Sequence, residues 1–144
     1  MKLDSIPWTV IRGRNSEGVV LFRFREFTPG FPKADFPHRL NVFWTSTASD
    51  ENGLPEQEES DRMCVFEDRL IEATELDAQS VLSLVVTGKG QREYVFHTKA
   101  TDEFLSRLTD MQQKEEPYPI EINHVTDPVW EYVDRILGDI DLPK

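Results

Sequence analysis

The sequence predicts a single α+β domain, built on a ferredoxin-like βαββαβ core with a β-hairpin added before it and a helix after it. The length of 144 residues suits one domain. Nine Phe, three Trp and three Tyr supply large apolar side chains for a core and argue against disorder. Between residues 39 and 125 the periodic segments run in the order strand, helix, strand, strand, helix, strand, which is the split βαβ pattern.

The N-terminal hairpin is expected within residues 1–26. Two β-rich runs flank turn-forming residues, and a proline-rich loop follows them. Side chains alternate along a strand, so Phe22 and Phe24 share one face of the second run. Arg23 and Arg25 share the other face.

The core begins with a strand over residues 40–45 and a long helix. Pro55 and the glutamates after it suit the first turn of this helix, which we expect to run to about Leu76. Its inner stripe recurs at helical spacing and consists of Met63, Phe66, Leu70, Ala73 and Thr74.

The second half of the core follows from the same patterns. The nearly continuous apolar run 80–87 predicts a central strand, joined by a glycine-bearing turn to a partner strand over 92–98. A second helix is expected from Thr101, and a last core strand over 118–125. An Asp-Pro pair then predicts the start of the C-terminal helix, residues 127–140.

Charge excludes several classes of partner. The net charge is −11, which repels phosphate backbones and anionic membrane surfaces. A basic protein partner is allowed, because long-range charge steers such encounters. The single cysteine suits a reducing compartment, and no apolar run is long enough for a signal peptide or a membrane span. We therefore expect a soluble cytoplasmic protein.

No motif of a known catalytic or metal site is present. The three histidines and the cysteine lack metal-ligand spacing, and the glycine turn near residue 89 is not followed directly by a helix, as a phosphate loop requires. The sequence therefore predicts no metal, no cofactor and no catalytic residue. Cys64 is expected to be a small buried residue rather than a nucleophile.

Glu67 is the most informative single residue. It falls inside the apolar arc of the first helix, where a carboxylate must pair with a donor or lose its charge. Arg92 is the preferred partner, with Tyr94 and Arg23 behind it. Glu67 is then either a site carboxylate or half of a structural ion pair that locks helix to sheet.

Other candidate residues are the strand arginines, a histidine and a tryptophan. Arg23 and Arg25 could form a small basic patch for a carboxylate or phosphate ligand, or a solvated outer face paired with local acids. His97 could line a cleft with Glu67, Arg92 and Arg23, between the open sheet face and the proline-rich loop. Trp44 is expected in the core, with an interface role as the alternative.

Three segments together resemble a known family. They are Gly53-Leu54-Pro55 with Glu58-Glu59 and Phe66-Glu67-Asp68, then Thr87-Gly88-Lys89-Gly90-Gln91-Arg92-Glu93, and then Asp127-Pro128-Val129-Trp130-Glu131-Tyr132. In this order they resemble the bacterial domain of unknown function 695 family, over nearly the whole chain. The resemblance implies no activity, substrate or catalytic residue. The family pattern has tyrosine after the second hairpin strand, where this chain has His97.

A weaker resemblance points to the acidic regulator of ribonuclease E activity B family, which is ferredoxin-like and acts by binding a protein. Our leading hypothesis is therefore a non-enzymatic protein-binding or regulatory module. The alternative is an anionic-ligand site or an unrecognised hydrolase, with a cleft near Glu67 and Arg92. A third hypothesis is a homodimer through the sheet face that the helices leave open.

Overall fold

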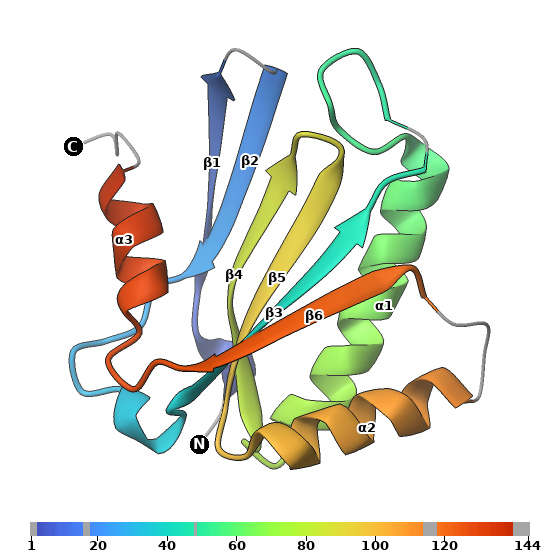
Figure 1. The fold of residues 1–144 in the computed structure, drawn as a ribbon. Coiled ribbons are helices and arrows are strands. Elements are labelled where there is room, and N and C mark those ends of the chain that lie inside the picture. Colours follow the sequence, from blue (N-terminus) through green and yellow to red (C-terminus); the bar gives the residue numbers. More distant parts are fainter. Residues whose placement is uncertain (1–2, 16–17, 48, 114–117, 140–144) are drawn as a thin grey trace.

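The structure, a computed structural model, describes residues 3–15, 18–47, 49–113 and 118–139. They form one six-stranded antiparallel sheet with three α-helices, so the predicted α+β class is confirmed (Figure 1). The strands lie in the order β1-β2-β4-β5-β3-β6. Their bounds are β1 Trp8–Asn15, β2 Gly18–Arg25, β3 His38–Thr45, β4 Ser80–Gly88, β5 Gln91–Thr98 and β6 Ile120–Thr126; those of the helices are α1 Gln57–Glu75, α2 Thr101–Gln113 and α3 Glu131–Asp139.

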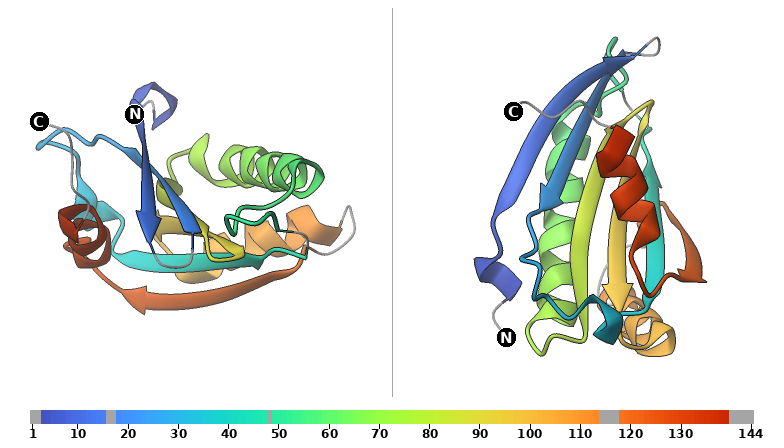
Figure 2. Two further views of the ribbon diagram at one scale, coloured as in Figure 1. Left: turned by 90° about the horizontal axis from the view of Figure 1, so that it is seen from above. Right: turned by 90° about the vertical axis from the view of Figure 1, so that its left-hand side faces the viewer.

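Helices α1 and α2 cover one face of the sheet (Figure 2). Met63, Phe66 and Leu70 of α1 are fully buried, because they recur at helical spacing and form one apolar stripe. Phe104 and Leu108 of α2 join the same core. The strands contribute Leu40, Val42, Trp44, Leu82, Val85, Tyr94 and Phe96.

Helix α3 packs on the opposite face of the sheet, against side chains of β2, β4 and β5. Its Val133 is buried against Phe24, Leu84 and Val95. The helices leave uncovered the outer part of this face, over β3 and β6 (Figure 1). We call this area the open face; its side chains are Arg39, Asn41, Phe43, Glu121, Asn123 and Val125, with Glu93 of β5 at its edge, hydrogen-bonded to Tyr132 of α3.

The start of α3 differs from the prediction. The helix begins at Glu131, three residues after the predicted Pro128, because Trp130 adopts a left-handed backbone conformation with φ 58°. Asp127 still caps the helix: its carboxylate accepts hydrogen bonds from the N–H of Glu131 at 2.9 Å and of Tyr132 at 3.3 Å. The predicted end at residue 140 lies outside the described residues.

Three smaller findings concern the start of α1, Cys64 and membrane crossing. Helix α1 begins at Gln57 rather than at Pro55, which instead forms an isolated bridge with Ser49. Cys64 is exposed on α1, so the expectation that it is buried is wrong. Among the described residues, no helix combines the length and the apolar character that a membrane crossing requires.

Candidate functional site

Glu67 is buried, as its place on the helix predicts, but its partner is Arg23 rather than Arg92. Both terminal nitrogens of the Arg23 guanidinium donate to the Glu67 carboxylate, one of them at 2.9 Å to Oε2. Arg92 instead donates from Nε to Thr87 Oγ1 at 2.9 Å. The Tyr94 hydroxyl donates to the carbonyl of Met63. The expected pair of Glu67 with Arg92 is therefore wrong.

Arg25 forms a second ion pair beneath α1. Its guanidinium lies 2.9 Å from Oε2 of Glu75, and both side chains are almost fully buried. The N–H of Leu82 also donates to this carboxylate at 2.7 Å. Burial raises the pKa of Glu75, while the positive charge of Arg25 and the hydrogen bond from Leu82 act in the opposite direction.

The two strand arginines therefore form neither the expected basic patch nor a solvated outer face. They point at α1 because β2 lies next to β4, inside the area of sheet that α1 covers. The ring of Trp8 on β1 lies against both guanidinium groups, at 4.8 Å from Arg23 and 4.7 Å from Arg25. These contacts fasten the hairpin to the core.

Trp44 is fully buried in the core, where its indole N–H donates to Glu59 at 2.9 Å. His97 is also fully buried, but on the other side of the sheet, stacked on Trp130 at 3.8 Å between ring centroids. Its Nδ1 lies 3.0 Å from Ser83 Oγ, and its Nε2 has no partner among the described residues. Burial lowers the pKa of His97 to about 3.

The predicted candidates therefore do not line one cleft. Glu67, Arg23 and Arg92 lie on the side of the sheet that α1 covers, whereas His97 lies on the side of α3. The sheet separates the two groups, so the predicted cleft is wrong. What role each residue has in binding stays a prediction.

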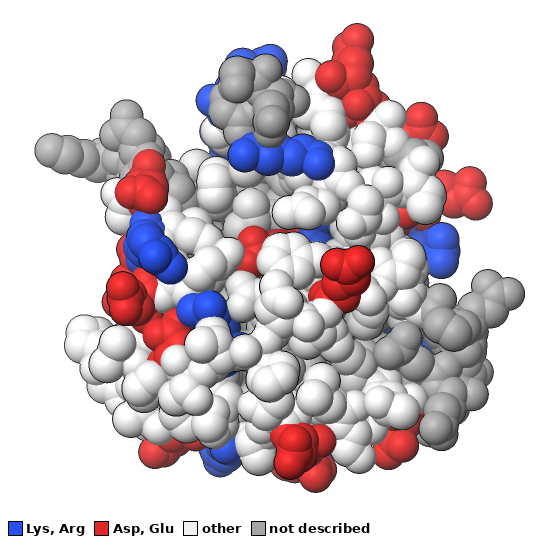
Figure 3. Space-filling view, viewed as in Figure 1, with Lys and Arg blue, Asp and Glu red and all other residues white. Residues whose placement is uncertain are grey.

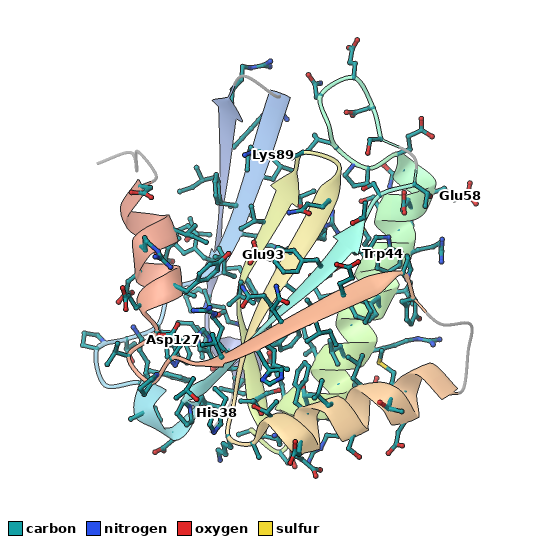
Figure 4. All side chains as sticks on the ribbon, viewed as in Figure 1. His38, Trp44, Glu58, Lys89, Glu93 and Asp127 are labelled. Carbon is teal, nitrogen blue, oxygen red and sulfur yellow. The ribbon has the colours of Figure 1, made fainter. Side chains whose placement is uncertain are left out.

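A polar network that sequence reasoning missed lies beside the open face, centred on Glu93. Oε2 of Glu93 accepts a hydrogen bond from Asn41 Nδ2 at 2.7 Å and another from the Tyr132 hydroxyl at 2.5 Å. Glu93 is 7% exposed, and both donors are uncharged. Figure 4 shows Glu93 in the middle of the sheet, with Lys89 toward the hairpin end and Asp127 toward the start of α3. In the sequence, this network is indicated only by a carboxylate, Glu93, inside a predicted strand.

The network extends to the cap of α3 through Arg39. This side chain donates to Asn41 Oδ1 at 2.9 Å and to Asp127 Oδ2 at 2.8 Å, and its guanidinium lies 4.4 Å from the Tyr132 ring centroid. Burial acts to raise the pKa of Asp127, but the two backbone N–H groups and Arg39 lower it overall. Burial and the hydrogen bond to Glu93 raise the pKa of Tyr132, so its hydroxyl stays protonated and donates.

A pocket of about 290 Å³ adjoins Glu93. Apolar walls come from β2, β4 and α3, and polar groups come from the β4–β5 hairpin. Its lining residues are Val20, Phe22, Val86, Gly88, Lys89, Gln91, Glu93 and Ile136. A second groove, of about 540 Å³, runs between α1 and α2 on the opposite side of the molecule and is lined by Arg69, Glu72, Ala73, Leu76, Arg107, Asp110 and Met111.

Two of the three segments that carry the family resemblance meet at this site. The hairpin segment supplies Glu93 and the polar pocket wall, and the segment at the start of α3 supplies Asp127 and Tyr132. A family model described as a family of unknown function (DUF695) matches residues 7–136. The chain belongs to the DUF695 family. The match runs from β1 into α3, so it includes the Glu93 network.

Comparison with curated proteins and with solved structures gave no match to this DUF695 chain. These comparisons therefore leave the more distant resemblance to the ribonuclease E regulator family as a hypothesis. Within the described part of the DUF695 domain, no group of three His, Cys, Asp or Glu side chains is placed to hold a metal ion. The Glu93 network offers a fixed hydrogen-bond acceptor beside an apolar pocket, which is an arrangement suited to binding.

Proposed function

We propose that this DUF695 domain is a non-enzymatic protein-binding module, and that its partner is a basic protein that contacts the open face. The observation that carries the proposal is the low charge of this face on a chain of net charge −11 (Figure 3). Val125 is 45% exposed there, and Phe43 is half-buried between Glu93 and Glu121 of the neighbouring strands. Apolar surface with few charges is typical of the centre of a protein interface.

Charge supports a basic partner over an acidic one. The charged side chains of the open face are Arg39, Glu93 and Glu121; Arg39 is paired with Asp127, whereas neither acid has an ion-pair partner among the described residues. The overall field of the chain attracts positive surfaces at long range, which favours rapid encounter with a basic protein. The alternative anionic-ligand site near Glu67 has less support, because Glu67 already occupies the Arg23 guanidinium.

The test compares two exposed valines on opposite sides of the molecule. Val125→Arg places a bulky charge on the open face, whereas Val65→Arg makes the same change on α1, at a residue 48% exposed. Tagged wild-type and variant chains are used for quantitative capture from a lysate of the source organism. We expect a specific basic protein that Val65→Arg retains and Val125→Arg loses. Equal recovery by both variants contradicts the proposal.

A second copy of the chain is the other candidate for covering the open face. Size-exclusion chromatography with light scattering at two concentrations distinguishes it from a separate partner. Self-repulsion at a net charge of −11 disfavours this homodimer. If the chain forms a concentration-dependent dimer that Val125→Arg abolishes and Val65→Arg keeps, the open face binds a second copy of the chain rather than a basic protein.

We also infer that β3, α1, β4, β5, α2 and β6 have the ferredoxin-like arrangement. The order β4-β5-β3-β6 with all neighbours antiparallel supports this inference, as does the position of α1 and α2 on one face. An experimental structure that gives another strand order or a left-handed crossover refutes it.

A further inference from the structure

We propose that the pocket beside Glu93 receives the side chain of a lysine or arginine from the basic partner. This inference rests on the proposed function and specifies the chemistry of its contact. The pocket pairs apolar walls from Val20, Phe22, Val86 and Ile136 with a carboxylate, Glu93, and its lining also includes Lys89, which lies toward the hairpin end (Figure 4). A lysine or arginine has the same two parts in one side chain, an aliphatic stem and a cationic head.

The state of the Glu93 carboxylate indicates a hydrogen-bond donor as ligand. Both of its hydrogen bonds go to Oε2, and among the described residues none goes to Oε1. The donors Asn41 and Tyr132 are neutral, so they orient the carboxylate without cancelling its charge. A cationic N–H group at Oε1 would form the charge-assisted hydrogen bond that gives such contacts their strength.

The size of the pocket favours one side chain over a larger molecule. Its volume of about 290 Å³ lies just below the roughly 300–1,000 Å³ of pockets that hold drug-sized ligands. The pocket also lies beside the open face, because Glu93 is paired in the sheet with Phe43. A partner seated on the open face can therefore reach it with one extended residue.

The first experiment titrates the full chain with three blocked amino acids and follows backbone amide resonances by NMR. The probes are Nα-acetyl-lysine amide, Nα-acetyl-arginine amide and the uncharged Nα-acetyl-norleucine amide. We expect the two cationic probes to shift the amides of Gln91, Glu93 and Ile136 with dissociation constants on the order of millimolar, as suits ligands this small. The norleucine probe should bind at least tenfold more weakly.

The matched variants are Glu93→Gln on β5 and Glu58→Gln on α1, away from the open face. Glutamine keeps the acceptor oxygen for Asn41 and Tyr132, so Glu93→Gln removes the charge while keeping the local network. We expect it to weaken both cationic probes at least tenfold, whereas the exposed Glu58 on α1 can be changed without effect. Equal binding of norleucine amide, or unchanged binding to Glu93→Gln, overturns the inference. Unchanged thermal melting of both variants verifies that they are folded.

The second experiment repeats the capture of the partner with the same two variants. Loss of the partner by Glu93→Gln, with retention by Glu58→Gln, supports the inference. If Glu93→Gln captures the partner as well as wild type does, the pocket is not the contact, even where free amines bind to it. In that case the loss caused by Val125→Arg still stands, so failure of the pocket and failure of the proposed function are distinguishable.

Discussion

His97 is expected to make the stability of the domain depend on pH between about 6.5 and 3, the interval between its ordinary pKa and its pKa in the fold. The ring is fully buried against Trp130, and burial lowers its pKa to about 3 from an ordinary value of 6.5. The unfolded chain therefore binds a proton below pH 6.5 that the folded chain rejects. The contribution of the neutral His97 ring to the free energy of unfolding is fully present above pH 6.5. It is lost as the pH decreases toward 3.

The size of this effect follows from the difference in pKa. Between pH 7.5 and pH 5.0, most of the loss comes from the 1.5 units below 6.5, at about 1.4 kcal/mol for each unit. Wild type should therefore lose about 2 kcal/mol of unfolding free energy from this group over that range. With a urea slope of about 2 kcal/mol/M, the unfolding midpoint moves by about 1 M.

His97→Phe isolates the contribution, because phenylalanine keeps a ring against Trp130 and cannot be protonated. The groups whose charges act on His97 are Asp127, Arg39 and Lys33, and they remain in the variant. The difference in urea midpoint between pH 7.5 and pH 5.0 should shrink by about 1 M relative to wild type. His124→Phe, at an exposed position on β6, is the matched control and should keep the wild-type difference. If His97→Phe keeps it as well, the ring is not excluded from protonation in the fold and the reasoning fails.

Two further predictions concern the buried polar groups. Glu75→Leu leaves the buried guanidinium of Arg25 without its partner and should cost about 3–5 kcal/mol in urea unfolding, whereas Asp77→Asn, at an exposed pair, should cost less than about 1; equal costs refute the claim that the Glu75 pair is buried. Tyr132→Phe removes the hydrogen bond to Glu93 and should lower stability by about 1–2 kcal/mol. No loss of stability in that variant means that the hydrogen bond does not form in solution.

The order and type of the elements could be predicted because each depends on local pattern. The stripe of α1 and the alternation of β2 are properties of one segment each. The predicted start of α3 is wrong because Trp130 adopts a left-handed backbone conformation. Trp130 is held there by its packing on His97 and by indole hydrogen bonds to the loop carbonyls of Lys33 and Phe36. Those contacts join segments far apart in the chain, so no local pattern records them.

The Glu93 network was missed for a related reason. It needs the register of β3 against β5, which places Asn41 within reach of Glu93, together with the docking of Tyr132 from α3. Each of the three residues alone has an ordinary interpretation as a polar group in a strand or on a helix. Only their convergence distinguishes this carboxylate from the surface acids of a strongly acidic chain.

The location of Arg23 and Arg25 shows most clearly what a local sequence pattern cannot predict. Alternation places both arginines on one face of β2, but it does not say which face a helix covers. The pairing of β2 with β4 decides this, because it puts the arginine face beneath α1. On α1, Glu67 and Glu75 are eight residues apart, slightly more than two turns, so both acids lie on the same side of the helix. Two acids on one side of a helix and two arginines on one face of a strand are therefore complementary, and considering them as a pair would have predicted that β2 lies under α1.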